Sequence, residues 1–166
     1  MSTENHNKPE AKEKMKSLAE DIKIAMMVTG FEQKPLDAIP MATKKVDEAG
    51  NIWFLSLRSS EHNQNIERTG AIQLLYSKPS DMEFLSVYGT GEIVTEKDVL
   101  EDLYEKTSDS WFDGVNDPQL TAIKFTPSEA YYWDTKGNKY VTLLKMGAAA
   151  ITGNDQDVGR KGKLKL

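Results

Sequence analysis

The sequence contains no cysteine and only two histidines, His6 and His62. Without thiols the chain can form no disulfide bridge, thiolate zinc site or iron–sulfur cluster, and it has no cysteine nucleophile. Two histidines are too few for a histidine-rich metal centre, so we expect no zinc or iron enzyme. No residue stands out as an acid–base catalyst, so we assign no catalytic residue from the sequence.

Long hydrophobic runs are absent as well. No apolar stretch approaches the roughly 20 residues that a membrane-spanning helix needs. Residues 1–14 carry no hydrophobic segment of the kind found in signal peptides. The 21 Lys and Arg residues are outnumbered by 26 Asp and Glu, which gives a net charge of −5 and suits the chain poorly to binding nucleic-acid phosphates. We therefore expect a cytoplasmic protein that binds neither membranes nor nucleic acid.

The 166 residues fit one domain of ordinary size, and three Trp, six Tyr and five Phe can anchor its core. We expect a disordered N-terminus over 1–8, a domain over 9–152 and a polar tail over 153–166 that frays. Residues 96–117 carry eight acidic side chains and two lysines. They lack the ligand spacing of a calcium-binding EF-hand, so we interpret them as a solvated acidic face.

Apolar runs bounded by turn residues predict strands through the middle of the chain. The turn cluster Asp47–Asn51 predicts a hairpin that pairs 39–46 with 51–57. Gly89 and Gly91 predict a bend or bulge of the kind needed at barrel corners. They do not form a dinucleotide-binding fingerprint, because the third glycine position is Val94. The predicted strands are 24–31, 39–46, 52–57, 71–76, 83–94, 120–126 and 130–133.

Four helices are expected beside these strands. The first begins at Pro9, and apolar residues recur on one of its faces at Met15, Leu18, Ala19 and Ile22. Ser60 can cap a helix over 61–68 that ends at Gly70. Thr95 and Asp98 resemble a capping box for a third helix that reaches about residue 107. The fourth is expected over 140–150.

Six or seven strands joined mostly by tight turns indicate a mainly β protein, a small β-barrel with flanking helices. The predicted site lies where strand 52–57 leads into the helix capped by Ser60. Free backbone N–H groups and hydroxyls at a helix start can hold an anion such as phosphate. The strand before it offers an aromatic wall for a planar ring. The alternative is that Ser60 is an ordinary helix cap and the aromatic residues belong to the barrel core.

Short motifs in a fixed order give the chain a resemblance to a known family. The earlier ones are Pro40 to Thr43, Trp53 to Ser56, and Ser60 before a helix. The later ones are Val87 to Gly91, Trp111 to Gly114, Thr126-Pro127 and Tyr132 to Asp134. Together, over about 15–155, they resemble the general stress protein 26 family. That family belongs to the pyridoxamine 5′-phosphate oxidase-related proteins, which have an FMN-binding split barrel of six to seven antiparallel strands.

The resemblance implies a homodimer that binds FMN, with FAD as the alternative, in a groove between two barrels. It implies that the neighbouring subunit closes the site near Trp111, whereas Trp133 belongs to the core. It also implies that one strand lies along the flavin ring, with the residues Trp53, Phe54, Leu55 and Ser56. Met41 and Thr43 of another strand contribute from below the ring. The phosphate is held by the following loop and helix start, with the residues Arg58, Ser59, Ser60 and His62.

Two positions depart from the family pattern. Ile39 stands where the family commonly has Arg, and His62 stands where it usually has Lys. Glu61 adds a carboxylate beside the expected phosphate. Arg58, Lys44 or Lys45 could supply the missing positive charge, and at most one of the two lysines can face the groove.

Three functions follow from this interpretation. The first is a flavin-dependent oxidoreductase on an unknown small molecule, in which the cofactor carries the reaction. Strict pyridoxamine-phosphate oxidase activity is not expected, because no basic cluster remains for a second phosphate. The others are a non-catalytic flavin-binding protein and a cofactor-less structural dimer.

Overall fold

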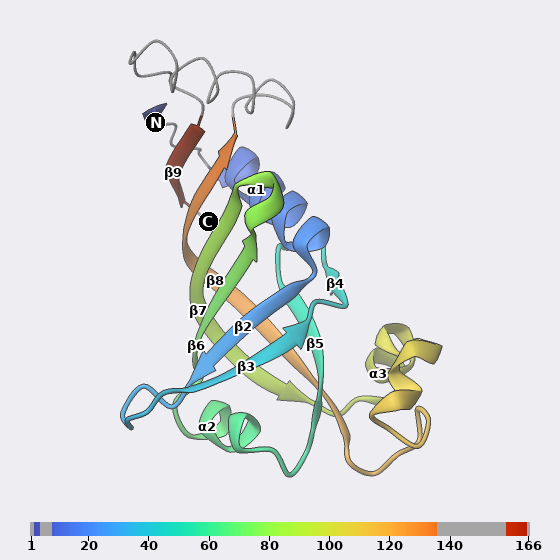
Figure 1. Ribbon diagram of the computed structural model, residues 1–166. Coiled ribbons are helices and arrows are strands. Elements are labelled where there is room, and N and C mark those ends of the chain that lie inside the picture. The colour runs from blue at the N-terminus through green and yellow to red at the C-terminus, as the bar shows by residue number, and fades with distance from the viewer. Residues whose placement is uncertain (1, 4–7, 136–158, 166) are drawn as a thin grey trace.

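The computed structural model describes residues 2–3, 8–135 and 159–165, and it is built mainly from β-strands (Figure 1). One curled sheet has the strand order β1-β9-β8-β7-β6-β2-β3, and β5 joins it by pairing with β8 and β4. This architecture confirms the predicted mainly β barrel with flanking helices. The strands are β1 (Ser2–Thr3), β2 (Ile24–Thr29), β3 (Asp37–Ala42), β4 (Lys45–Val46), β5 (Ile52–Leu57), β6 (Ala71–Lys78), β7 (Glu83–Val94), β8 (Leu120–Thr135) and β9 (Gly159–Lys165).

Helices cover the two ends and one side of the curled sheet (Figure 1). They are α1 (Lys8–Ile22), α2 (Glu61–Thr69) and α3 (Lys97–Leu103), with the 3-10 turns η1 (Pro79–Asp81) and η2 (Lys106–Ser110). Met15, Leu18 and Ala19 of α1 are buried, as their helical spacing predicts. The predicted capping box of α3 is wrong. Glu96 is the cap residue, and its carboxylate accepts a hydrogen bond from the Thr95 amide instead of capping the helix.

The barrel interior is filled by inward-facing residues of the strands together with the apolar face of α1. Its largest buried side chains are Tyr76, Tyr132, Phe54, Phe125, Met15 and Met27. A second, smaller cluster lies on the outside of the barrel, where α3 and Phe112 cover part of β8. Leu120 and Ala122 of β8 belong to this outer cluster, whereas Ile123 and Phe125 belong to the interior. The first half of β8 is therefore buried on both faces.

Residues 120–135 form one strand and not the two that the sequence predicts. Pro127 cannot donate a backbone hydrogen bond, but it lies opposite Gly89, where the register of β7 against β8 shifts between Tyr88 and Gly89. A Cβ at Gly89 would lie 2.2 Å from the Thr126 carbonyl oxygen, so only glycine fits this approach. The predicted bulge is therefore present, and it lets β8 run on without a break.

The predicted hairpin of 39–46 with 51–57 is largely wrong. β3 pairs with β2 along all six of its residues, from Ile24 opposite Ala42 to Thr29 opposite Asp37. Only the two residues of β4 pair with β5. The chain changes partner between the two strands, where the Thr43 amide donates to the Lys23 carbonyl and the Lys44 amide donates to the Trp53 carbonyl.

The C-terminal segment is not a frayed tail over 159–165. β9 pairs with β8 from Glu129 to Thr135, Leu164 is fully buried in the interior, and Arg160 binds both oxygens of the buried Asp134. β1 pairs with β9, so the predicted disorder is also wrong at Ser2–Thr3. Lysines surround the single inward leucine, and this composition hides the strand pattern. The helix predicted over 140–150 lies outside the described residues.

Gly89→Ala should destabilise the fold more than Gly91→Ala does. The new methyl at 89 meets backbone atoms of Thr126 and Pro127, whereas at 91 it meets the flexible end of Ile72. We expect a loss of about 2–4 kcal/mol for the first variant and under about 1.5 kcal/mol for the second. Urea denaturation measures both values, and equal losses would contradict the close approach of β7 and β8.

Leu164→Ala should lower the free energy of unfolding by about 2–5 kcal/mol, because it opens a cavity at a fully buried position. Leu36→Ala is the matched control, because Leu36 is 48% exposed and exposed substitutions change stability by about 0.5 kcal/mol or less. Thermal and urea unfolding provide the comparison. A Leu164→Ala variant as stable as the control would show that β9 does not pack in the core.

Candidate functional site

Strand β5 places its side chains on two opposite faces. Phe54 and Ser56 point into the barrel and are buried, and the Ser56 hydroxyl hydrogen-bonds the Thr121 hydroxyl at 2.8 Å. Trp53 and Leu55 point outward and pack with the cluster beneath α3. The four residues predicted to lie along a ring therefore do not form one wall, because adjacent strand residues face opposite ways. Only Trp53 and Leu55 can offer side chains to an outside ligand.

The two edges of β5 are also unlike one another. One edge pairs with β8 along the whole strand, from Ile52 opposite Phe125 to Leu57 opposite Leu120. On the other edge, β4 pairs only with Ile52 and Trp53. Among the described residues no strand pairs with that edge beyond Trp53, and none pairs with the outer edge of β3. The sheet is thus split between β3 and β5. The backbone groups of Leu55 and the Leu57 amide face the split, whereas those of Phe54 and Ser56 face β8 and the Leu57 carbonyl accepts from the Ser60 amide.

Met41 and Thr43, predicted to contribute from below, come from β3 and the residues directly after it. Met41 is half-buried and packs against the barrel core, as does Ile39. The Thr43 hydroxyl hydrogen-bonds the Tyr76 hydroxyl at 2.8 Å. Burial raises the pKa of Tyr76 far above its usual value, and the hydrogen bond with Thr43 opposes that shift only in part. Tyr76 therefore stays protonated, and Thr43 has a fixed partner inside the protein.

Helix α2 begins where β5 ends. Ser60 is its N-cap, with an extended backbone and a hydroxyl that accepts a 3.3 Å hydrogen bond from the Asn63 amide. Gly70 closes the other end with φ of 70°, as the sequence predicts. Helix geometry leaves the amides of Glu61 and His62 without an acceptor inside the helix. The predicted helix start is therefore present, with two amides open to an anion.

His62 lies beside the cap and is half-buried. Its Nε2 and the Ser60 hydroxyl are 3.0 Å apart and share a hydrogen bond. Burial lowers the pKa of His62 below its usual value of 6.5, and the nearby Asp37 carboxylate offsets part of that effect. The imidazole is therefore uncharged at neutral pH, unlike the lysine that the family pattern has at this position.

Arg58 and Ser59 are both exposed in the loop between β5 and α2. Arg58 Nε donates to the Pro118 carbonyl at 3.0 Å, and the Ser59 carbonyl accepts a 3.4 Å hydrogen bond from Gln64. The Ser59 hydroxyl has no hydrogen-bond partner among the described residues. This loop therefore places one guanidinium and one hydroxyl beside the open amides of α2.

The two lysines considered as substitutes for the missing charge lie elsewhere. Lys44 Nζ is 3.1 Å from the Ser108 hydroxyl and 3.7 Å from the Glu105 carboxylate. Lys45 forms an ion pair with Asp102 of α3. Both lysines serve the contact between β4 and the α3 side of the barrel, so neither reaches the start of α2.

The two remaining predicted aromatic residues are both exposed. Trp111 follows η2 and is 76% exposed. Its predicted place near a neighbouring subunit stays a prediction. Trp133 is wrongly predicted as core. It is 37% exposed on the outer face of β8, because the inward positions there belong to Tyr132 and Asp134.

Sequence reasoning missed two buried polar groups beneath α2. Asn63 donates to the Thr121 hydroxyl at 3.0 Å, and its own Oδ1 is buried without a partner among the described residues. Asn65 donates to the Thr29 hydroxyl at 3.1 Å and to Asp37 at 3.4 Å. Asn63 lies three residues before the buried Ile66 and therefore on the same helix face, which was the available signal. These bonds fix α2 against β2, β3 and β8, and so they fix the position of its N-terminus.

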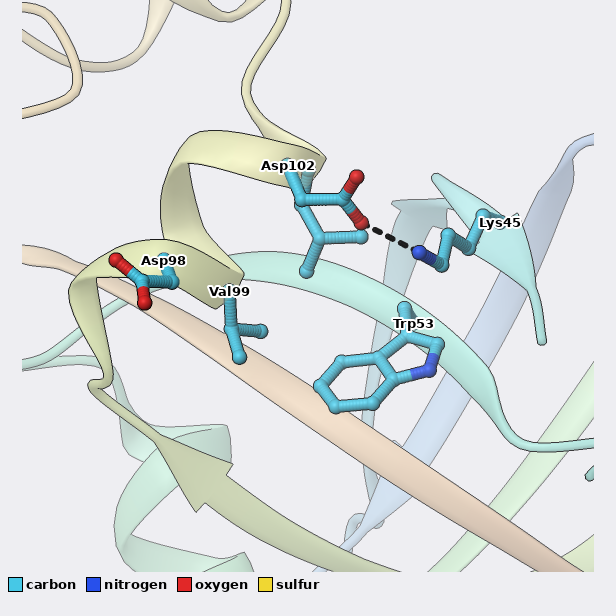
Figure 2. Close-up of a pocket in the computed structure, with 6 residues that line it drawn as sticks. Lys45, Trp53, Asp98, Val99 and Asp102 are labelled. Carbon is cyan, nitrogen blue, oxygen red and sulfur yellow. Dashed lines mark hydrogen bonds and ion pairs between the residues drawn. The ribbon is translucent and has the colours of Figure 1, made fainter.

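A pocket opens on the other side of β5, between that strand, β4 and α3 (Figure 2). Its volume is about 230 Å³. Trp53 forms one wall and α3 the other, while the ion pair of Lys45 and Asp102 crosses its rim. The lining residues are Lys45, Trp53, Asp98, Val99, Asp102 and Leu103. No sequence motif pointed to this pocket, because the residues that line it come from three separate elements.

One group of carboxylates among the described residues could approach a metal ion. It consists of Asp21, Asp81 and Glu83. Lys78 already forms ion pairs with Asp21 and Asp81 at 2.5 and 2.7 Å. The Lys78 ammonium group therefore already supplies the positive charge, and we interpret the cluster as an ion-pair network.

Solved structures of other proteins share this fold. A Jannaschia sp. CCS1 protein named for general stress protein 26 superposes with a TM-score of 0.76 and 22% identity over 95% of this chain and 99% of its own. General stress protein 26 from Bacillus anthracis str. Sterne gives 0.65 and 19%, over 73% of this chain and 92% of its own. The general stress FMN/FAD binding protein from Xanthomonas citri gives 0.65 and 18%, over 77% and 90%. These likenesses confirm the split-barrel fold.

Sequence comparisons complete this assignment. Comparison with curated proteins finds no significant match. None of the described helices is long and apolar enough to cross a membrane. The model of the family described as pyridoxamine 5′-phosphate oxidase like matches residues 10–157, which is most of the chain. By that match, and in agreement with the motifs and the split barrel, the chain belongs to the pyridoxamine 5′-phosphate oxidase-like family.

Proposed function

We propose that this protein binds FMN, with FAD as the alternative, along the split between β3 and β5. The observation that carries this proposal is the edge of β5 at Leu55 and the Leu57 amide, where no strand pairs, and which leads directly into the open amides of α2. A planar heterocycle can hydrogen-bond such a strand edge while its phosphate meets the helix start. Membership of the family and a structural neighbour named as FMN/FAD binding support the same reading.

The donor groups at the helix start fit a phosphate. Two backbone amides, at Glu61 and His62, and the Ser59 hydroxyl can donate to its oxygens, and Arg58 can add a charge-assisted bond. The electrostatics are weaker than in the family pattern, because Glu61 is negative and His62 is neutral at pH 7. We therefore expect the phosphate to be held mainly by hydrogen bonds, with moderate affinity.

The flavin, when bound, would supply hydride or electron transfer, as flavins do in oxidoreductases. The residues of this chain would bind and orient it. The backbone edge of β5 would position the ring, Trp53 and Leu55 would cover part of the outer face, and α2 would hold the phosphate end. We propose a flavin-dependent oxidoreductase on a small molecule. The cytoplasmic location expected from the sequence stays a prediction.

A second candidate function is a flavin-free structural dimer. It is favoured by Ile39, which packs against the core where the family pattern has an arginine, together with the neutral His62. In that case Ile39 and His62 stabilise the fold and do not bind an anion. Flavin binding separates the two candidates.

Replacing His62 with Lys or Glu61 with Gln should tighten FMN binding by about three- to tenfold each, because each change makes the helix start more positive by one charge. Glu67→Gln, at the far end of α2, is the charge-matched control and should leave the affinity unchanged. Wild-type affinity should also rise as the pH falls below 6.5, because the pKa of His62 is lowered by burial and the imidazole gains its proton only there. Titration followed by quenching of flavin fluorescence gives these affinities.

Riboflavin, which lacks the phosphate, is the ligand control for that experiment. It should bind more weakly than FMN and respond to neither substitution. Equal affinities for riboflavin and FMN would contradict the phosphate site. The absence of FMN binding in the wild type and in the His62→Lys and Glu61→Gln variants would favour the structural dimer.

We also propose that the outer face of the sheet is the subunit interface of a homodimer. One row across neighbouring strands runs from Pro40 to Met26, Leu75, Ser86 and Tyr131. Met26, Leu75 and Tyr131 are each at least 40% exposed. Ile24 and Trp133 extend this apolar row on the same face. Exposed apolar side chains gathered on one face of a sheet are typical of protein interfaces.

Leu75→Glu should shift the protein from dimer to monomer, because it buries a carboxylate in the centre of the proposed interface. Met82→Glu is the control, because Met82 is similarly exposed but lies on the turn between β6 and β7. Sedimentation velocity of both variants and the wild type gives the outcome. A monomeric wild type, or a dimer that persists in Leu75→Glu, would exclude this face as the interface.

A further inference from the structure

The pocket between β5 and α3 has an aromatic wall whose orientation is fixed from the opposite side. Trp53 Nε1 donates a 2.9 Å hydrogen bond to Asp47, and Asp47 also accepts bonds from the Asn51 amide and side chain, each at 2.9 Å. The indole nitrogen therefore points away from α3, and its six-membered ring faces the helix beside Val99 (Figure 2). The ring needs no rearrangement to receive a ligand, which favours binding.

The anchor of this ring keeps its charge over the whole physiological range. Burial raises the pKa of Asp47, but hydrogen bonds from Trp53 and Asn51 outweigh it and leave the pKa below its usual value. Asp47 is therefore ionised and accepts the indole N–H at any pH near neutral. The hydrogen bond that orients the Trp53 ring is therefore present at every pH near neutral.

The rim of the pocket favours a cation. Lys45 is paired with Asp102, whereas Asp98 is exposed and has no ion-pair or hydrogen-bond partner among the described residues. The lining thus carries two carboxylates against one ammonium group. The wider segment 96–117, which includes α3, has eight acidic residues and two lysines. A negative potential of this kind attracts cations to the pocket and repels anions.

Size limits the ligand further. The volume of about 230 Å³ lies below the roughly 300–1,000 Å³ typical of pockets for drug-sized molecules. One aromatic ring with a short substituent fits that space. The pocket also lies beside Trp53 at the start of β5, whereas α2 follows the other end of the strand (Figure 1). It is therefore separate from the proposed phosphate site.

We infer that this pocket is a second ligand site, which binds a small aromatic cation. Its ring would stack on Trp53 between that indole and the side chains of Val99 and Leu103. Its amine or amidine group would pair with Asp98 at the rim. This site shares Trp53 with the proposed flavin site but uses neither the backbone edge of β5 nor the start of α2, and it does not depend on flavin binding.

The test is a titration of the ¹⁵N-labelled full chain with benzamidine, followed by NMR at the three tryptophan indole N–H signals. Trp53→Phe identifies the signal of Trp53. We expect that signal to shift saturably with a dissociation constant of about a millimolar, whereas the signals of Trp111 and Trp133 do not. Benzamide, which is neutral, and benzoate, which is negative, should bind at least about fivefold more weakly if charge selects the ligand.

Three substitutions sharpen the test because their expected effects differ in sign. Asp98→Asn removes the free carboxylate and should weaken benzamidine binding by about three- to tenfold. Lys45→Gln removes the competing ammonium group and frees Asp102, so it should strengthen binding by a similar factor. Glu101→Gln changes an acidic residue of α3 that lies outside the pocket and is paired with Lys97 at 3.5 Å, so it should have little effect.

Two results would overturn the inference. One is the lack of a saturable Trp53 shift with benzamidine in the folded wild-type protein. The other is an equal response of Asp98→Asn and Glu101→Gln, which would show that only the general acidic charge of the chain acts. The amide spectrum of each variant shows whether it is folded, so a loss of binding cannot be mistaken for unfolding.

Discussion

The close approach of β7 to β8 at Gly89 is the contact on which the rest of the fold depends. Gly89 has no side chain, so its backbone can approach the Thr126 carbonyl closely. The two strands therefore stay paired past Pro127, and β8 extends over sixteen residues. Its first half then pairs with β5 and its second half pairs with β9. The single strand β8 therefore supports β5, which belongs to the candidate site, and also holds the C-terminal strand β9 on the barrel.

This arrangement explains why β5 has a free edge. β8 holds β5 from one side, and the chain before β5 turns away to pair β3 with β2, so little of β5 is covered on the other side. The strand then leads without a long loop into the Ser60 cap of α2, whose position is fixed by the buried Asn63 and Asn65. An unpaired strand edge and an open helix start are thus held next to one another by a rigid support. The proposed flavin site is a consequence of that geometry, and its weak charge is a property of Glu61 and His62.

Much of this could be predicted from the sequence, where the signal is local. Ser60 and Gly70 mark the ends of α2 because cap conformations depend on single residues, and Gly89 marks the bulge because only glycine permits it. The partner of β3 was wrongly predicted, because the turn cluster Asp47–Asn51 favours pairing with the following strand, whereas β3 pairs back with β2 across residues 30–36. β9 was hidden since a single inward leucine among lysines gives no visible alternation. The pocket was hidden for a related reason, because its walls come from β4, β5 and α3.

The central claim is that FMN lies with its ring along β5 and its phosphate at α2. Backbone amide shifts of the ¹⁵N-labelled protein on adding FMN and then riboflavin test this placement directly. We expect the amides of Leu55 and Leu57, which face the split, to shift with both ligands, whereas the amides of Glu61 and His62 should shift strongly only with FMN. Shifts that avoid both segments, or equal shifts of Glu61 and His62 with the two ligands, would contradict it.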